Sequence, residues 1–501
     1  MSWTRRLTTA LLLIGLAAAP ALAQTVLRIG LNDDPDALDP TISRAYTGRL
    51  VFAAFCDKLF DVTPDLKIVP QLATGYEWAA NGRSVTIKLR PGVKFHDGEP
   101  LNAEAVRFNI ERHLNTPGSF RKSEIGEIKS VDVVNDLTVR LNLSQPLVPL
   151  IAALTDRAGM MVSPKAAREL GDKFGTRPVC AGPYKFVERV AQGKIVGERF
   201  ADYWDKGNVH IDRVEFVPIT DSTARLASLR SGDLQMIERV SPTDLAQIRA
   251  DNRLKVVGVP ELGYQMIPLN LANGPRAKTL SDVRVRQAID LAIDRETLVK
   301  TVFNDEYIAG NQWVSPSSPY YNTKLPVRKR DVARARQLLK EAGQPNLAFT
   351  LIVPPERDRQ EASLVLQAML AEAGIAVTLQ TQENVTMLQN GRKGDFEAYF
   401  TFWSGRPDPD GNIFTFASCN GAQNDSKYCS ADVDALLTKA RHVADPAERK
   451  KLYDQVTEIL LRDVPRLHLW HRRVFTGFSA KIQGFTPYPD GIIRLQGLKV
   501  S

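Results

Sequence analysis

The chain has 501 residues, of which 44% are hydrophobic and 24% charged, and its formal net charge is +8 at neutral pH. This composition is typical of a soluble globular protein, and the length predicts two or three domains. The 65 basic residues are scattered among 57 acidic ones rather than gathered into a stripe, which argues against nucleic-acid binding.

The N-terminus has the pattern of a secretory signal. A basic start that includes Arg5 precedes the apolar run 7–19, and an A-x-A cleavage site ends at Ala23. No cysteine follows the apolar run, which disfavours a lipid anchor. We therefore predict a signal peptide at residues 1–23 and a mature chain in the periplasm of a Gram-negative cell. No later apolar run approaches the roughly 18 residues needed to span a bilayer.

The stretch 81–114 predicts a strand, two turns and a helix. Apolar and polar residues alternate over 85–89, as in a half-buried strand, and Asn102 is placed to cap the helix. An acid-base pair of His96 and Asp97 is the enzymatic interpretation of the second turn. An Asp-Gly corner explains the same residues without chemistry.

Four cysteines in an exported chain suggest two disulfides. Cys419 and Cys429 enclose a polar loop with little apolar material to hold it, which a covalent link would stabilise. Cys56 and Cys180 then pair by elimination, with reduced buried thiols as the open alternative. The chain has no C-x-x-C and no clustered histidines, and we predict neither a metal site nor a cofactor.

The last third of the chain shows α/β patterning. Residues 349–353, a helix that ends at Ala373, and residues 375–380 form a strand-helix-strand unit, which predicts parallel pairing. Aspartates are placed to cap four further helices, at Asp282, Asp294, Asp331 and Asp445.

The segment TIKLRPGVKFHDGEPLNAEAV, residues 86–106, resembles the signature of the family 5 solute-binding proteins. These are extracytoplasmic receptors of bacterial ABC importers for peptides, nickel, haem, opines and related solutes. Later segments continue the resemblance from about Leu27 to Gln496. It implies an α/β fold of the periplasmic binding protein type (class II, large three-domain form), with two lobes joined by a two-segment hinge. Family members usually carry glycine where Cys180 stands, a departure that favours the bridge to Cys56.

The resemblance also implies how the chain is divided. We expect three parts built from interleaved segments and two hinge crossings, near 263–269 and 467–474. The parts are a lobe I core (24–46, 176–262 and 476–501), an extra domain of lobe I (47–175) and lobe II (263–475).

The segment 403–412, WSGRPDPDGN, is the main candidate for ligand specificity. It follows a predicted strand, and open α/β sheets bind ligands at strand ends. It resembles the loop in which peptide-binding members place a tryptophan and, three residues later, an aspartate for the peptide's amino group. Here the residue three positions after Trp403 is Arg406, whose guanidinium would favour a carboxylate or phosphate. In a shifted loop, Asp408 or Asp410 would bind the cationic amino group instead. The structural alternative is that Arg406 pairs with one of these two aspartates.

Three weaker cleft candidates are Tyr264 on a hinge strand, Tyr46 after the first strand, and Arg157. Core packing explains each of them equally well. The loop after Trp403 also lacks the histidine that a nickel complex would need.

We therefore predict a receptor that captures a peptide or peptide-like small solute and delivers it to an ABC permease of the inner membrane, acting as a monomer. The alternative is a receptor for an anionic non-peptide solute, opine-like or sugar-acid-like. A secreted hydrolase is the rival class, but the sequence has no G-x-S-x-G and no H-E-x-x-H, and we predict no enzyme.

Overall fold

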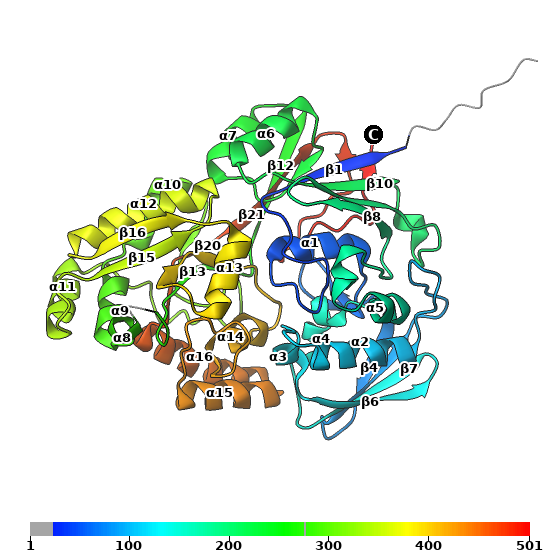
Figure 1. Ribbon diagram of the computed structural model, residues 1–501, viewed down its shortest axis with the longest axis horizontal. Coiled ribbons are helices and arrows are strands. Elements are labelled where there is room, and N and C mark those ends of the chain that lie inside the picture. Colours follow the sequence, from blue (N-terminus) through cyan, green and yellow to red (C-terminus); the bar gives the residue numbers. More distant parts are fainter. Residues whose placement is uncertain (1–23, 275–276) are drawn as a thin grey trace, which may run out of the picture.

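The computed structural model describes residues 24–274 and 277–501. The predicted signal peptide lies outside the described residues. Figure 1 shows three bodies: the sheet of β1, β10 and β8 at the upper right, the layer of α2, β4 and β7 below it, and the helices and strands around β15 at the left. We call them lobe I, the extra domain and lobe II. The residue boundaries expected for them stay a prediction.

Lobe I is built on a seven-stranded sheet in which β1 lies centrally. β1 pairs in parallel with β10 and β11, whereas β12 and β21 pair antiparallel at one edge. In sheet order the strands are β12 (Leu254–Pro260), β21 (Arg473–Ser479), β11 (Met236–Ile237), β1 (Val26–Leu31), β10 (Arg213–Pro218), β9 (Lys194–Arg199) and β8 (Tyr184–Val190).

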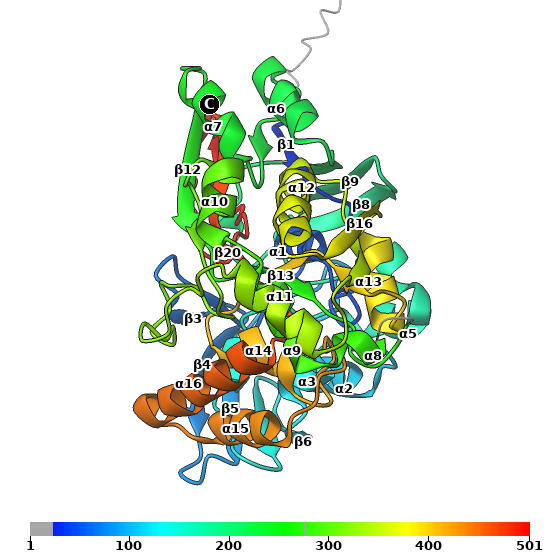
Figure 2. The ribbon, with the colours of Figure 1, turned by 90° about the vertical axis from the view of Figure 1, so that its left-hand side faces the viewer.

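Helix α1 (Tyr46–Phe55) belongs to the hydrophobic cluster of β1 and β8, although the expected partition begins the extra domain at residue 47. Two further helices, α6 (Ser222–Ser231) and α7 (Leu245–Arg249), lie at the opposite end of the molecule from α15 (Ala431–His442) and α16 (Pro446–Asp463) (Figure 2).

The extra domain has a four-stranded antiparallel sheet covered by α2 (Ala103–Asn115). Val85 and Ile87 of the sheet and Val106 and Ile110 of the helix are fully buried in one cluster, which confirms the predicted strand and helix. The Asn102 side chain accepts a hydrogen bond from the backbone N–H of Ala105, as its capping role requires. In sheet order the strands are β4 (Ala73–Trp78), β5 (Ser84–Leu89), β7 (Thr138–Leu143) and β6 (Ile128–Asn135).

Lobe II contains the predicted parallel unit. β15 (Ala348–Val353) pairs in parallel with β16 (Ala376–Thr381), and α12 (Arg357–Glu372) connects them. The four predicted aspartate caps all accept a backbone N–H in the first helical turn. The capped helices are α9 (Val283–Leu291), α10 (Arg295–Phe303), α11 (Val332–Glu341) and α16 (Pro446–Asp463).

Two chain crossings join the lobes. β12 of lobe I leads into β13 (Tyr264–Pro268) of lobe II, and β19 (Arg466–His468) returns through β20 (Trp470–His471) to β21. Between them Glu261 is fully buried and forms ion pairs with Arg239 and Arg472, at 2.9 and 3.0 Å. This arrangement is the two-segment hinge expected from the sequence.

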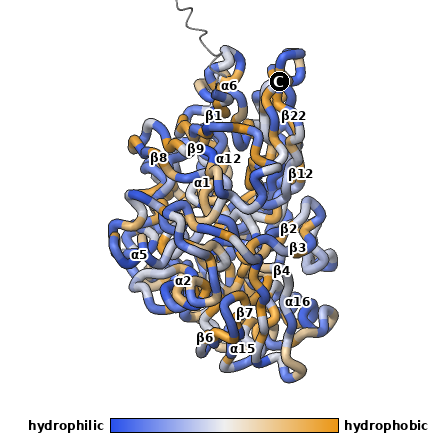
Figure 3. The backbone as a smooth tube through the Cα atoms, turned by 90° about the vertical axis from the view of Figure 1, so that its right-hand side faces the viewer, coloured by the Kyte–Doolittle hydropathy of each residue, from blue (hydrophilic) through white to orange (hydrophobic). Residues whose placement is uncertain are grey.

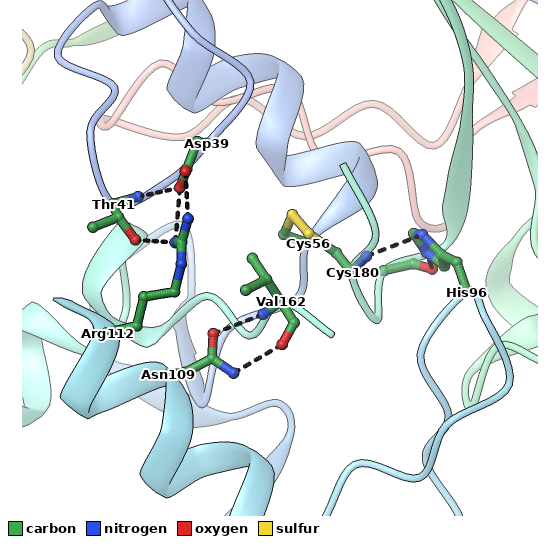
Figure 4. Close-up of a disulfide and its surroundings, with 9 residues drawn as sticks. Asp39, Thr41, Cys56, His96, Asn109, Arg112, Val162 and Cys180 are labelled. Atoms are coloured by element: carbon green, nitrogen blue, oxygen red, sulfur yellow. Dashed lines mark hydrogen bonds and ion pairs between the residues drawn. A yellow bond between two sulfur atoms is a disulfide. The ribbon is translucent and has the colours of Figure 1, made fainter. Parts of the chain in front are cut away.

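Both expected cysteine pairs lie at disulfide distance, with S–S separations of 1.96 Å for Cys56 and Cys180 and 2.15 Å for Cys419 and Cys429. The first bridge fixes the end of α1 to the loop before β8 (Figure 4). Beside it, the backbone N–H of Cys180 donates to Nδ1 of His96, and Nε2 of His96 contacts the carbonyl oxygen of Gly182 at 3.0 Å.

The His96 ring is therefore part of a structural corner, and burial lowers its pKa to about 4. Asp97 accepts a hydrogen bond from the Ser163 hydroxyl, whereas both ring nitrogens of His96 contact the backbone of Cys180 and Gly182. The two residues do not form the acid-base pair of the enzymatic interpretation.

Hydrophobic and hydrophilic stretches alternate over short distances along the backbone (Figure 3). Within residues 24–274 and 277–501, no helix is long and apolar enough to cross a membrane.

Candidate functional site

Three cavities lie between lobe II and the parts that face it. The central cavity has Arg44, Tyr46 and Arg157 on one wall and Phe402 and Trp403 on the other. No carboxylate occurs among the described residues that line it. The central cavity therefore presents aromatic surface and positive charge.

The two flanking cavities differ in charge. The acidic cavity lies between the extra domain and lobe II and contains four carboxylates, those of Glu124, Asp156, Asp408 and Asp410. The hinge-side cavity is rich in arginine. Trp403 lines both the central and the acidic cavity, which places these two side by side.

The loop that carries the predicted specificity residues is shorter than the sequence suggested. β18 (Thr401–Trp403) ends at Trp403, and α14 (Asp410–Ala417) already begins at Asp410. Gly405 adopts φ +78°, and a Cβ there would lie 2.3 Å from the Leu262 side chain. Glycine is required at this point because the loop approaches the hinge strand so closely.

Asn412 ties this loop together. Its Oδ1 accepts hydrogen bonds from Nε1 of Trp403 at 3.0 Å and from the backbone N–H of Arg406 at 2.6 Å. Its Nδ2 donates to the carbonyl oxygen of Arg406 at 3.0 Å. The Tyr264 hydroxyl donates to the carbonyl oxygen of Asn412 at 2.8 Å. One buried amide thus sets the position of both Trp403 and Arg406.

Arg406 reaches across the cleft to the extra domain. Its Nε lies 2.9 Å from Oδ2 of Asp156, and its guanidinium stacks 4.2 Å from the centroid of the Trp403 ring. The structural alternative, in which Arg406 pairs with Asp408 or Asp410, is wrong, because Arg406 pairs with Asp156, whereas the two loop aspartates pair with other arginines. Burial lowers the pKa of Arg406 to about 10, and Asp156 offsets only part of this effect.

The two loop aspartates have arginine partners on helices of lobe II. Asp408 accepts two hydrogen bonds from Arg449, at 2.8 and 3.0 Å, and Asp410 lies 3.3 Å from Nε of Arg441. Burial raises the pKa of Asp410 to about 6. Asp408 is therefore already matched by a cation of its own chain.

The weaker candidates separate into two groups. Tyr46 and Arg157 line the central cavity, where Tyr46 also lies under the guanidinium of Arg239 at 3.9 Å. Tyr264 is fully buried against Phe416 inside lobe II and lines none of the three cavities. The structure thus brings Trp403, Arg406, Tyr46 and Arg157 to the cleft and places Tyr264 behind it as a support.

Contacts across the cleft hold the lobes together. Arg44 of the lobe I side lies 2.6 Å from Asp425 of lobe II. Asn384 donates to Asp33 at 2.7 Å, and the Ser241 hydroxyl donates to Asp358 at 2.6 Å. These pairs join side chains from both lobes, so the structure represents the closed arrangement.

The family is decided by a profile match. The family described as "Bacterial extracellular solute-binding proteins, family 5 Middle" matches residues 67–424. The chain belongs to family 5 of the bacterial extracellular solute-binding proteins. It is 30% identical to the glutathione-binding protein GsiB of Pectobacterium atrosepticum, over 96% of this chain and 95% of the relative.

Solved structures of two binding proteins resemble this family 5 protein. DppA from Helicobacter pylori in complex with the peptide STSA has a TM-score of 0.88 at 26% identity, covering 95% of this chain and 98% of that one. AgaA from A. tumefaciens R10 in complex with agropinic acid has a TM-score of 0.87 at 26% identity, covering 95% and 99%. The class II periplasmic binding protein fold expected from the sequence is confirmed.

The sequence did not point to several residues of this family 5 cleft. Arg44, Asp156 and Asn384 come from segments without a distinctive pattern, and only tertiary contacts reveal them. A buried asparagine at the end of the 403–412 segment is the one signal that sequence reasoning could have used. Within the described part of the chain, no group of three or more His, Cys, Asp or Glu is placed to hold a metal ion.

Proposed function

We propose that this family 5 protein is a periplasmic receptor that captures a peptide or peptide-like small solute between its lobes and delivers it to an ABC permease of the inner membrane. The observation that carries the proposal is the closed cleft, in which buried charged and aromatic side chains from both lobes enclose adjoining cavities beside the hinge. The glutathione-binding relative and the peptide held by the DppA structure support this class of ligand.

A second candidate is a receptor for an anionic non-peptide solute. The arginines of the central cavity favour it, since no described carboxylate lines that cavity, and the AgaA structure holds agropinic acid. A receptor of either kind binds its solute without turning it over and acts as a monomer.

Export is the remaining part of the proposal. Residues 1–23 act as a signal peptide that is cleaved after Ala23, which leaves Gln24 as the first residue of the mature protein. N-terminal sequencing of the protein from the periplasmic fraction tests this, and a retained Met1 or a lipid-modified residue would contradict it.

Ligand capture is tested by calorimetric titration of the purified protein with glutathione and with agropinic acid, followed by analysis of the solutes after incubation. A bound ligand at a hundredfold excess over Kd stabilises the fold by about 2.7 kcal/mol, which thermal unfolding detects. Recovery of the solute unchanged supports a receptor. Chemical conversion of the bound solute would place the protein among enzymes.

A further inference from the structure

Two of the contacts that join the lobes place a carboxylate against a neutral partner. Asp33, in the loop after β1, accepts a hydrogen bond from Nδ2 of Asn384 of lobe II at 2.7 Å. Asp358, in the first turn of α12, accepts one from the Ser241 hydroxyl of lobe I at 2.6 Å. Among the ion pairs of the described residues, none includes either carboxylate. A carboxylate that is withdrawn from water and bound only by neutral groups is costly to keep ionised.

The opposite lobe brings a like charge toward Asp33. The Asp33 side chain is buried. Its neighbour Asn32 faces Glu356 of lobe II, with 3.5 Å between Nδ2 of Asn32 and Oε1 of Glu356. The Glu356 charge acts against ionisation of Asp33. Because the two carboxylates belong to different lobes, they approach each other when the lobes close.

The other charged groups around Asp33 do not cancel this repulsion. Asp34, the next residue of the same loop, pairs with Arg189 at 3.1 Å. Arg359 of α12 favours the ionised form of Asp33, but its guanidinium lies 2.8 Å from Glu356. Burial, together with the charge of Glu356, therefore raises the pKa of Asp33 from 3.8 to about 7.

Asp358 shows the same behaviour from the lobe II side of the contact. The charged and titratable groups around it are Arg225 of lobe I and Glu356, Glu361 and Tyr307 of lobe II. Burial and the two glutamate charges raise the pKa of Asp358 to about 6, because the Ser241 hydroxyl and Arg225 offset only part of their effect. Both carboxylates at these contacts thus bind a proton more readily in the closed form.

Asp33 is separate from the cavities that would hold a solute. None of the three cavities has Asp33 among its described lining residues. Its partner Asn384, at the start of α13 (Asn384–Lys393), does line the central cavity. A change at residue 33 therefore acts on the contact between the lobes without removing a side chain that lines a cavity.

We propose that closure of the lobes takes up a proton from solvent, with Asp33 neutral in the closed form and ionised in the open form. This inference goes beyond the proposed function, because it concerns the equilibrium between two forms of the protein and not the identity of the solute. When the lobes separate, Asp33 regains water and moves away from Glu356, so its ordinary acidity returns.

The direction of the pH dependence follows from this difference. The closed form binds the additional proton, so a lower pH shifts the population toward it. A rise through about pH 7 ionises Asp33 and favours the open form. Asp358 contributes in the same direction at a slightly lower pH, near about 6.

The test is small-angle X-ray scattering of the ligand-free protein at about pH 5.5 and about pH 7.5, on either side of the expected transition. The wild type should have the smaller radius of gyration at the lower pH. In Asp33→Asn the substituted amide cannot ionise but keeps an oxygen that accepts from Asn384, so this variant should stay compact at the higher pH. A purely structural role of Asp33 predicts the opposite, a variant that is more open than the wild type at both pH values.

Two further variants complete the test. Glu356→Gln removes the like charge and releases Arg359 to act on Asp33, so this variant should open at a lower pH than the wild type. Glu104→Gln removes an exposed carboxylate of α2 and is the matched control, which should keep the wild-type response.

Solute affinity should follow the same equilibrium. From about pH 5.5 to about pH 7.5, the affinity of the wild type for glutathione should fall about ten- to thirtyfold relative to that of Asp33→Asn, as measured by calorimetric titration. Both proteins meet the same ligand, so the ligand's own titration cancels in this comparison. A relative affinity that stays constant with pH would contradict the coupling.

The outcomes separate this inference from the receptor function. A wild-type radius of gyration that does not change with pH, or the same change in Asp33→Asn, overturns the inference and leaves the receptor in place. If glutathione does not bind, a pH-dependent radius that Asp33→Asn abolishes still supports the proton uptake, and the result counts against glutathione as the solute.

Discussion

Arg406 of lobe II and Asp156 of the extra domain form an ion pair across the cleft, with 2.9 Å between Nε and Oδ2. Because Asp156 also contacts Arg49 and Arg157, this carboxylate is the point at which the two sides of the closed cleft meet electrostatically. Its loss would leave several buried cations without a partner.

Asp156→Asn should therefore lower the free energy of unfolding by about 3–5 kcal/mol, the usual effect of breaking a buried ion pair from one side. Urea titration measures this. Glu104→Gln is the control, because Glu104 pairs with Arg107 on an exposed helix face, where such pairs contribute about 1 kcal/mol or less. A loss no larger than that of the control would show that Asp156 is not needed to neutralise Arg49, Arg157 and Arg406.

The contact between Arg44 and Asp425 should stabilise closure. Both side chains are buried, and they come from opposite walls of the cleft. In a double-mutant cycle with Arg44→Ala and Asp425→Ala, the coupling energy should reach about 0.5–3 kcal/mol in solute affinity. Each single variant should also increase the radius of gyration of the ligand-free protein in small-angle X-ray scattering. Additive effects on affinity would mean that the pair does not contribute to closure.

Asn412 should control the shape of the specificity loop. Asn412→Ala removes one donated and two accepted hydrogen bonds and leaves Nε1 of Trp403 without its partner. Solute affinity should fall by about tenfold or more, because each unmatched buried group costs about 1–3 kcal/mol. Asn412→Asp keeps both accepted hydrogen bonds and should retain more affinity than the alanine variant. Equal affinities of Asn412→Ala and the wild type would remove Asn412 from the site.

The two disulfides should differ in their effect on stability. The Cys56–Cys180 bridge spans 124 residues and the Cys419–Cys429 bridge spans 10. Chain-entropy arguments give a loss of about 5 kcal/mol for removing the long bridge and about 3 kcal/mol for the short one. Unfolding of the two double-alanine variants, each compared with the oxidised wild type, provides the measurement. The prediction fails if the short bridge proves the more important one.

Asp57 should make stability depend on pH. Burial raises its pKa from 3.8 to about 7, and its Oδ2 accepts hydrogen bonds from Tyr203 and Trp204. Between about pH 4 and 7 the folded state therefore binds more protons than the unfolded state, and the free energy of unfolding falls as pH rises.

Asp57→Asn lacks this titration. The stability of the wild type relative to the variant should therefore decrease by up to about 4 kcal/mol from pH 4 to pH 7. Urea titrations of both proteins at several pH values measure the difference. Glu104→Gln again serves as the exposed control, and a difference between wild type and Asp57→Asn that stays constant with pH would contradict the raised pKa.

Much of the fold was determined by the sequence alone. The strand and capped helix of residues 81–114, the parallel unit around α12 and four aspartate caps depend on neighbours within a few residues, which periodicity and capping rules describe directly. The family followed from one long segment, because residues 86–106 match its signature. Two disulfides were expected from four cysteines in an exported chain, and their pairing from the polar loop between Cys419 and Cys429 and, by elimination, for Cys56 and Cys180.

The cleft itself was decided by tertiary structure. The sequence placed Trp403 and Arg406 in a loop, but the partner of Arg406 is Asp156, 250 residues away, and no local rule relates the two. Likewise Tyr264 has the sequence context of a cleft residue and in fact supports the loop from behind through Asn412. Local periodicity reports which face of an element is buried, whereas the partner of a buried charge depends on how the lobes close over each other. Only the folded chain therefore shows which carboxylate pairs with each buried arginine of the cleft.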